Sequence, residues 1–302
     1  MSTIIQCRDL CKRFGSKTVL KQLSFELASG DVAALIGPNG AGKTTLFSIL
    51  CGYALPDSGS VSLFGHKPGS SALFGKVAAL PQDAQFDPAF SIAEQLDFYG
   101  RLQGLSPKAA QQETRRVLAL VDLADQAQQK AAALSHGMRK RAAIAQAFIG
   151  APQLILLDEP TAGLDPVNAL QIRQLINRLS DGVSFMISSH NIFELEQLCN
   201  KVLYLEQGQL KQQTTAADDN AAQYLTLVLE QDNSAEVTAA LSQLPGLISL
   251  GAEQKKQLVL CYNPQLNNDF DLAVLQCLAA NGWRYRNLVK GQTLEQKLFS
   301  AN

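Results

Sequence analysis

Apolar and polar residues follow one another in a rhythm that predicts buried strands separated by helices. Four short runs are almost wholly apolar, which favours strands covered on both faces, and they lie at residues 32–36, 77–80, 154–157 and 183–187. The first thirty-six residues alternate short β-like runs with turns, and residues 61–64, between two glycines, predict one more strand. A chain with this alternation is expected to fold as α/β with a largely parallel sheet.

A helical insert interrupts this rhythm at about residues 86–132. Ser91 and Glu94 have the spacing of a capping box, in which each residue satisfies a free amide at a helix start. Ser106 and Pro107 predict the start of a second helix, with serine as the N-cap and proline in the first turn. The insert is therefore expected to be a helical subdomain.

The last third of the chain carries a different pattern. Residues 213–222 are polar and predict a linker. Between residues 223 and 302 the predicted order is strand, helix, strand, strand, helix, strand, which is typical of a small α+β unit with a ferredoxin-like fold. Residues 293–299 then predict a short final helix.

Composition and charge narrow the possible functions. Hydrophobic residues make up 46% and charged residues 18%, a balance too apolar for a disordered chain. The formal net charge is -1, so the chain lacks the basic excess that binding to duplex nucleic acid requires, and we expect no nucleic-acid partner. The six cysteines are scattered without a C-x-x-C pair, which favours reduced, packed thiols over a zinc site.

A glycine-rich loop follows the first apolar run. Residues 37–44 fit the phosphate-binding pattern G-x-x-x-x-G-K-[ST] and lie between a predicted strand and a predicted helix. Glycines let backbone N–H groups turn towards phosphates, and the helix adds its positive end. Lys43 can reach the β- and γ-phosphates, and the Thr44 hydroxyl can ligate Mg²⁺. The expected nucleotide contacts are Gly37, Pro38, Asn39, Gly40, Ala41, Gly42, Lys43, Thr44 and Thr45.

A pair of acidic residues follows the third apolar run. Asp158 ends that predicted strand, which places its carboxylate at the carboxyl edge of the sheet, where it can hold Mg²⁺. Glu159 comes next and can activate an attacking water. As the partner of the phosphate loop, this pair indicates hydrolysis of a nucleotide.

With these two motifs in this order, the chain resembles the ATP-binding subunits of ABC transporters, of the exporter type, over about residues 3–212. Five further features carry the resemblance, and their intervals agree with the family. They are the adenine-stacking aromatic Phe14, 29 residues before Lys43, the Q-loop residue Gln82, the signature at residues 134–138, the D-loop residue Asp165 and the switch residue His190. Taken singly, Phe14, Gln82, Asp165 and His190 could be ordinary core, loop or cap residues, and only their positions favour the functional interpretation.

The resemblance implies a fold and a domain layout. Residues 1–212 are expected to form a P-loop NTPase domain of ABC type, with a mostly parallel sheet core, an antiparallel β subdomain and the helical subdomain. A small C-terminal α+β accessory domain over residues 223–302 is expected to follow the linker.

The signature departs from the family's usual Leu-Ser-Gly-Gly-Gln. His136 replaces the first glycine and Met138 replaces the glutamine, whereas Ser135 and Gly137 are kept. In the family these two residues approach the γ-phosphate bound to the opposite subunit, and the helix expected from Arg139 onward adds its positive end. The departures put turnover rate and dimer affinity in question rather than the reaction.

The resemblance also implies the reaction and its cofactors. ATP and Mg²⁺ are expected to bind, with Thr44, Gln82 and Asp158 around the metal. Lys43, Gln82, Glu159 and His190 are the expected catalytic residues, and Glu159→Gln is expected to keep ATP binding while abolishing turnover. Two subunits would pair head to tail as a homodimer, with ATP at the interface.

The expected partner is a separate integral-membrane subunit. No segment reaches the 18 or more apolar residues of a spanning helix and no basic-then-apolar leader opens the chain, so we expect a cytoplasmic protein peripheral to the inner face of the membrane. Three alternatives remain open: the ATPase of a methionine-like importer, a soluble ABC ATPase serving translation, repair or cluster assembly, and a module that uses ATP only to dimerise. The transported substance is not readable from this chain.

Overall fold

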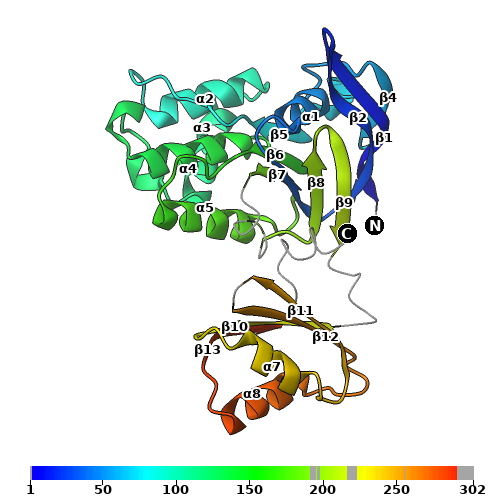
Figure 1. Ribbon diagram of the computed structural model, residues 1–302. Coiled ribbons are helices and arrows are strands. Elements are labelled where there is room, and N and C mark those ends of the chain that lie inside the picture. The colour runs from blue at the N-terminus through cyan, green and yellow to red at the C-terminus, as the bar shows by residue number, and fades with distance from the viewer. Residues whose placement is uncertain (1, 191–194, 196–197, 216–222, 255, 291–302) are drawn as a thin grey trace. The chain divides into compact units, whose positions relative to one another are not determined.

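The chain forms two compact units, Met1–Thr214 and Thr215–Asn302. The computed structural model, shown in Figure 1, describes residues 2–190, 195, 198–215, 223–254 and 256–290. The predicted linker begins within strand β9, which reaches Thr215, and its residues 216–222 lie outside the described residues. The predicted final helix at residues 293–299 also lies outside them.

A six-stranded sheet of order β5-β6-β7-β3-β8-β9 is the centre of the first unit. The pairs from β5 through β8 are parallel, which confirms the expected core. Parallel strands are covered on both faces, and the five residues of β3 and of β6 are accordingly all buried. The strands are β3 (Val32–Ile36), β5 (Val77–Leu80), β6 (Leu154–Asp158), β7 (Ser184–Ser189), β8 (Lys201–Glu206) and β9 (Gln209–Thr215).

An antiparallel sheet of order β2-β1-β4 forms the β subdomain. Its strands are β1 (Thr3–Phe14), β2 (Lys17–Ala28) and β4 (Ser58–Leu63). The first two have 12 residues each and are longer than the short runs that the sequence predicts. Irregular pairing between Cys7 and Leu10, with a φ of 47° at Asp9, interrupts the alternation and conceals their length in the sequence.

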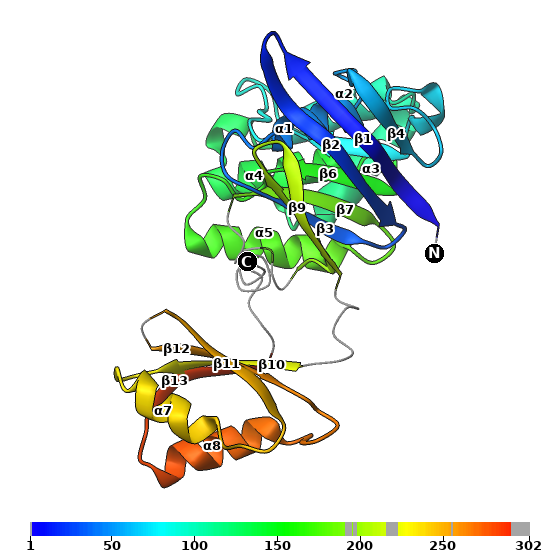
Figure 2. The same cartoon turned by 45° about the vertical axis from the view of Figure 1, so that its right-hand side comes forward.

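Five α-helices lie among the described residues of the first unit, and Figure 2 shows the helical subdomain beyond the antiparallel sheet. The capping box of Ser91 and Glu94 is confirmed, as are the Ser106 cap and the proline in the first turn of the next helix. Within the described ranges, no helix combines the length and apolar character needed to cross a membrane. The helices are α1 (Lys43–Leu50), α2 (Ile92–Leu102), α3 (Pro107–Leu120), α4 (His136–Ala147) and α5 (Pro166–Leu179).

The second unit has the expected order of strands and helices. Its four-stranded antiparallel sheet has the order β11-β12-β10-β13, so β12 separates β10 from β11, the split βαβ arrangement of a ferredoxin-like fold. Tyr262 stacks on Phe270 at 4.5 Å inside its own hydrophobic core. The elements are β10 (Gln223–Leu229), α7 (Ser234–Leu241), β11 (Leu247–Gln254), β12 (Gln257–Tyr262), α8 (Phe270–Ala280) and β13 (Tyr285–Lys290).

Candidate functional site

The carboxyl ends of four parallel strands meet at one edge of the central sheet. Ile36, the last residue of β3, pairs with Ser189 of β7, and Asp158, the last residue of β6, pairs with Ser188. Strand β5 ends at Leu80 beside β6. The segments that leave these strands therefore start side by side, at the edge where open parallel sheets bind ligands.

The loop after β3 is shaped by two glycines. A Cβ atom at Gly37 would collide with the carbonyl oxygen of Leu205, so a larger residue does not fit there. Gly42 has a φ of 111°, in the left-handed region that favours glycine, and it is the N-cap of α1. The loop thus leads directly into a helix whose first N–H groups are free to bind an anion.

Lys43 places a buried positive charge inside this loop. The residue is 5% exposed, and its ammonium donates to the carbonyl oxygen of Gly37 at 2.7 Å. The same ammonium forms an ion pair with Oε1 of Glu159 at 3.2 Å. A buried charge without a partner is costly, so these two acceptors hold the ammonium inside the loop. A bound phosphate could replace one of them as the partner of the ammonium.

The two carboxylates at the end of β6 belong to one hydrogen-bonded network. Asp158 Oδ2 accepts from the Thr44 hydroxyl at 3.1 Å, and Asp158 Oδ1 accepts from the Ser188 hydroxyl. The Glu159 N–H donates to Ser188 Oγ at 2.9 Å, and Glu159 Oε2 lies 2.7 Å from Nδ1 of His190. The phosphate loop, β6 and β7 are therefore tied together through polar side chains.

Glu159 is also strained. Its φ is 46°, a left-handed conformation that residues other than glycine rarely adopt. Strain of this kind persists where surrounding contacts enforce it, and it gathers at functional sites. Here the hydrogen bond from the Glu159 N–H to Ser188 holds the backbone, and the ion pair with Lys43 holds the carboxylate at the sheet edge.

Ser188 is a site residue that no sequence motif indicates, and its removal tests the network. The side chain is fully buried, and Ser188→Ala removes the donor to Asp158 Oδ1 and leaves the Glu159 N–H without its Ser188 acceptor. A buried hydrogen bond to a charged group contributes about 1.5–3 kcal/mol, so we expect kcat for ATP hydrolysis to fall about tenfold or more. A phosphate-release assay measures the change.

A matched control lies on the same strand. Ser184 is also buried, and its hydroxyl accepts from the Gly30 N–H at 2.9 Å, at the opposite end of β7. Both Ser184→Ala and Ser188→Ala remove a buried hydrogen bond and should lower the melting temperature. Ser184→Ala should leave kcat unchanged. Equal loss of kcat in both variants would contradict a role for Ser188 in ordering the carboxylates.

The Q-loop residue Gln82 is held through its backbone. It lies two residues beyond β5, with its side chain exposed, and its carbonyl oxygen accepts from Lys140 Nζ at 2.7 Å. Partial burial lowers the pKa of Lys140, and the charge of Asp83 acts in the opposite direction. The loop is thus fastened to α4 at the residue for which a catalytic role is expected.

The structure corrects the expected start of the helix at the signature. Helix α4 begins at His136, inside the motif, and not at Arg139. Ser135 is its N-cap, and the Ser135 hydroxyl accepts from the N–H of Met138 at 3.2 Å. The first N–H groups of a helix have no acceptor within the helix, and the Ser135 hydroxyl supplies one for Met138. The positive end of the helix therefore lies within the motif itself.

The signature and the D-loop are in contact. A Cβ atom at Gly137 would collide with the end of the Asn168 side chain on α5, so a larger residue there would push that side chain aside. Asn168 also bonds to Asp165, which is the N-cap of α5, as one of the open interpretations held. Hydrogen bonds from Asn168 hold the pKa of Asp165 below its usual value.

Phe14 stands apart from these contacts, at the end of β1. Its ring is 55% exposed, which suits a stacking surface better than a core position. Lys12 Nζ lies 5.3 Å from the ring centroid and pairs with Asp57, which also accepts from the Arg13 N–H. These bonds hold the end of β1 in place and leave the ring accessible.

The structure therefore brings together Lys43, Thr44, Asp158, Glu159 and His190 in one network. Sequence reasoning missed the residues that hold these groups in place, because their partners are distant in the chain. A polar residue at the end of an otherwise apolar strand was the signal available for one of them. The missed residues are Lys140, Asn168 and Ser188.

Comparisons with known proteins agree with this geometry. The family model described as ABC transporter matches residues 20–162. The Nod factor export ATP-binding protein I of Burkholderia lata is 38% identical over 207 residues, which are 68% of this chain and 68% of that protein. The chain belongs to the ATP-binding subunits of ABC transporters.

Other relatives of this ABC ATPase match over a similar length. The linearmycin resistance ATP-binding protein LnrL of Bacillus subtilis is 33% identical over 210 residues, 68% of each chain. A solved ATP-binding subunit of an ABC transporter is 26% identical, with a TM-score of 0.63 over 72% of this chain and 91% of that chain. A cassette solved in its ADP conformation, MJ1267, has a TM-score of 0.64 at 24% identity, over 71% of this chain and 92% of that one, which shows the same fold.

Proposed function

We propose that this ABC ATPase binds and hydrolyses ATP at the carboxyl edge of its central sheet in order to power export across a membrane. The observation that carries the proposal is the network linking the phosphate loop to Asp158, Glu159 and His190. Similarity to proteins named for Nod factor export supports the direction of transport. An importer of the methionine type is the second candidate, supported by the ferredoxin-like unit at the end of the chain.

The contacts suggest a role for each side chain. Lys43 and the backbone N–H groups of residues 39–45 hold the phosphates, and the Phe14 ring stacks on adenine. As a water oxygen attacks the γ-phosphorus, the Glu159 carboxylate accepts its proton and ADP leaves with the electrons of the broken bond. His190, bonded to Glu159 at 2.7 Å, fixes that carboxylate and reaches the γ-phosphate.

The residues also fit Mg²⁺. Thr44 Oγ1 and Asp158 Oδ2 are hard oxygen donors that already meet at 3.1 Å, and Gln82 supplies an amide oxygen nearby in the fold. Among the described residues, no group of three or more acidic, histidine or cysteine side chains gathers as a cage. Such a sparse donor set suits Mg²⁺, which keeps waters and phosphate oxygens in its shell and neutralises phosphate charge when bound.

Head-to-tail dimerisation would complete the site. Ser135, His136, Gly137 and Met138 form the first turn of α4 and its cap, and this turn would meet the γ-phosphate bound to a second copy. The contact of Gly137 with Asn168 places the Asp165 cap beside the same turn. ATP would then join two copies and hydrolysis would release them, which is a two-state mechanical element.

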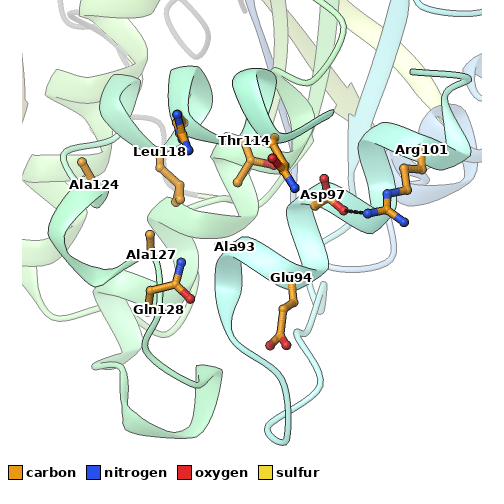
Figure 3. A pocket seen from close by; sticks show the side chains of 11 residues that line it. Ala93, Glu94, Asp97, Arg101, Thr114, Leu118, Ala124, Ala127 and Gln128 are labelled. Atoms are coloured by element: carbon orange, nitrogen blue, oxygen red, sulfur yellow. Dashed lines mark ion pairs between the residues drawn. The ribbon is translucent and has the colours of Figure 1, made fainter. Parts of the chain in front are cut away.

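We further propose that the membrane subunit contacts the helical subdomain. A hollow of about 730 Å³ lies between α2, α3 and residues 124–128 (Figure 3). Asp97 and Thr114 line it, and Asp97 Oδ1 and Thr114 Oγ1 are buried acceptors without a hydrogen-bond partner. Asp97 Oδ2 pairs with Arg101 at 2.8 Å, so a partly buried carboxylate and a half-exposed guanidinium meet at this hollow and offer a partner a polar contact. Phe98 and Leu102, exposed on the same helix, offer apolar contact beside it.

Asp97→Asn tests this partner. The change removes the charge of the Asp97–Arg101 pair that lines the hollow, so recovery of the ATPase with membranes containing its multi-spanning partner should fall about fivefold or more. ATP hydrolysis by the purified protein should not change. Asp181→Asn, at an exposed aspartate after α5 and away from the hollow, is the control and should be recovered like the wild type.

A pull-down from the soluble fraction tests the alternative of a soluble ABC ATPase that serves translation, repair or cluster assembly. Enrichment of ribosomes or repair factors, with no recovery on membranes, would favour an ABC ATPase that is not coupled to transport. Recovery on membranes only when the multi-spanning protein is co-expressed would support a peripheral subunit at the cytoplasmic face. In either case, we assign residues 1–212 to the ATPase and residues 223–302 to an accessory domain.

A further inference from the structure

One lysine connects the Q-loop to the signature helix. Lys140 lies in α4, and its ammonium donates to the carbonyl oxygen of Gln82 at 2.7 Å, across 58 residues of sequence. A cavity of about 410 Å³ separates the two segments, and its lining includes both residues together with His136 and Arg139. The Lys140 side chain therefore spans the edge of this cavity and supports the start of the Q-loop from the side of α4.

The helical end of this connection is rigid. Ala142, Ala143 and Ala145 are buried in the turns that follow Lys140, and the Ser135 cap fixes the turn before it. A helix packed in this way moves as one piece with its own N-terminus. Whatever displaces the signature turn therefore also displaces the Lys140 ammonium.

The far end of the Q-loop has its own anchor. The side-chain amide of Gln95 accepts from the Asp87 N–H at 2.7 Å and donates to the Asp87 carbonyl oxygen at 3.0 Å. Phe86 is buried beside this pair. The loop is thus fixed at Asp87 by α2 and at Gln82 by α4, while the Gln82 side chain remains exposed between them.

We propose that Lys140 is a positioning residue that aims the Gln82 side chain at its own nucleotide according to the position of the signature helix. The inference rests on the proposed function, because it needs Gln82 at one nucleotide and the signature turn at the other nucleotide of a dimer. Through this single charged hydrogen bond, occupancy of one composite site alters the metal-binding geometry of the other. Lys140 touches neither nucleotide.

The test compares Lys140→Met with Lys140→Arg and Lys108→Met. Methionine keeps most of the length without a donor, arginine restores a donor, and Lys108 is an exposed lysine of α3 that serves as control. A hydrogen bond to a charged group contributes enough that the Mg²⁺ concentration for half-maximal ATPase should rise about tenfold in Lys140→Met. The value of kcat at saturating Mg²⁺ should change less than about twofold, because Lys140 touches neither nucleotide.

A second measurement needs no turnover. Hydrogen exchange of the peptide covering residues 81–87, in nucleotide-free protein, should be faster in Lys140→Met, because the loop loses one of its two anchors. Lys140→Arg should return both the exchange rate and the Mg²⁺ dependence close to the wild type, and Lys108→Met should match the wild type throughout.

Three results would overturn the inference. Unchanged Mg²⁺ dependence in Lys140→Met would show that the bond does not position Gln82. A fall of kcat and of melting temperature without a shift in Mg²⁺ dependence would show a merely structural lysine. Absence of Mg²⁺-dependent hydrolysis in the wild type would overturn the proposed function itself, and this inference with it, and is recognised before any variant is compared.

Discussion

Glu159→Gln is expected to lower kcat for ATP hydrolysis about a thousandfold, since removal of a general base costs roughly 10²–10⁴ in rate. Glutamine keeps the shape of the side chain and can still bond to His190, whose Nδ1 lies 2.7 Å from the carboxylate. It cannot accept a proton from water. ATP binding should persist, because Lys43 retains its bond to Gly37, and ATP should hold two copies together as a stable dimer.

Phosphate release and light scattering after addition of ATP measure the two effects in one sample. Glu236→Gln, an exposed glutamate of α7, is the control and should behave like the wild type in both. Wild-type rates in Glu159→Gln would refute the assignment of the catalytic base. Loss of ATP binding in the same variant would instead show that Glu159 is needed to hold Lys43 in place.

Lys43→Ala is expected to weaken ATP binding about a hundredfold or more, because charge-assisted hydrogen bonds to phosphate are about twice as strong as neutral ones and each 1.4 kcal/mol is tenfold in affinity. The change removes the 5% exposed ammonium and leaves the Glu159 carboxylate buried with one partner fewer. Calorimetric titration with ATP and Mg²⁺ measures the affinity.

Two further variants separate binding from folding. Lys43→Met keeps the methylene groups that pack beneath the loop, so a folding defect caused by lost packing should recover while the affinity should not. Lys67→Ala, at an exposed position after β4, should bind ATP like the wild type. Full ATP affinity in Lys43→Met would mean that the phosphates bind elsewhere than at residues 37–45.

Local patterns were sufficient for the elements whose residues carry their own signals. Wholly apolar runs located β3 and β6, and Ser91 with Glu94 located the start of α2, because burial and capping depend on neighbours in sequence. The ferredoxin-like order of the second unit followed in the same way. The two long strands β1 and β2 did not, since a bulge near Asp9 shifts the alternation that would have predicted their length.

The same distinction between local signals and tertiary contacts applies to the candidate site. Spacing and residue type alone select Lys43, Thr44, Asp158, Glu159 and His190, because each motif is short and its chemistry is local. The helix expected from Arg139 in fact begins at His136, since Ser135 acts as its N-cap. That the Asp165 carboxylate caps α5 while Asn168 packs on Gly137 depends on two helices meeting, which no spacing reveals.

By itself, the sequence determined which chemistry this protein carries, namely a phosphate loop, two carboxylates and the order of the ABC motifs. Only the tertiary structure decided what holds that chemistry in place. Ser188 bonds to residues 29 and 30 positions away, and Lys140 bonds to a carbonyl 58 positions away. Such bonds have no signature in the chain, because a hydroxyl or an ammonium finds its partner only after the sheet edge and the helix have been brought together by burial of their apolar residues.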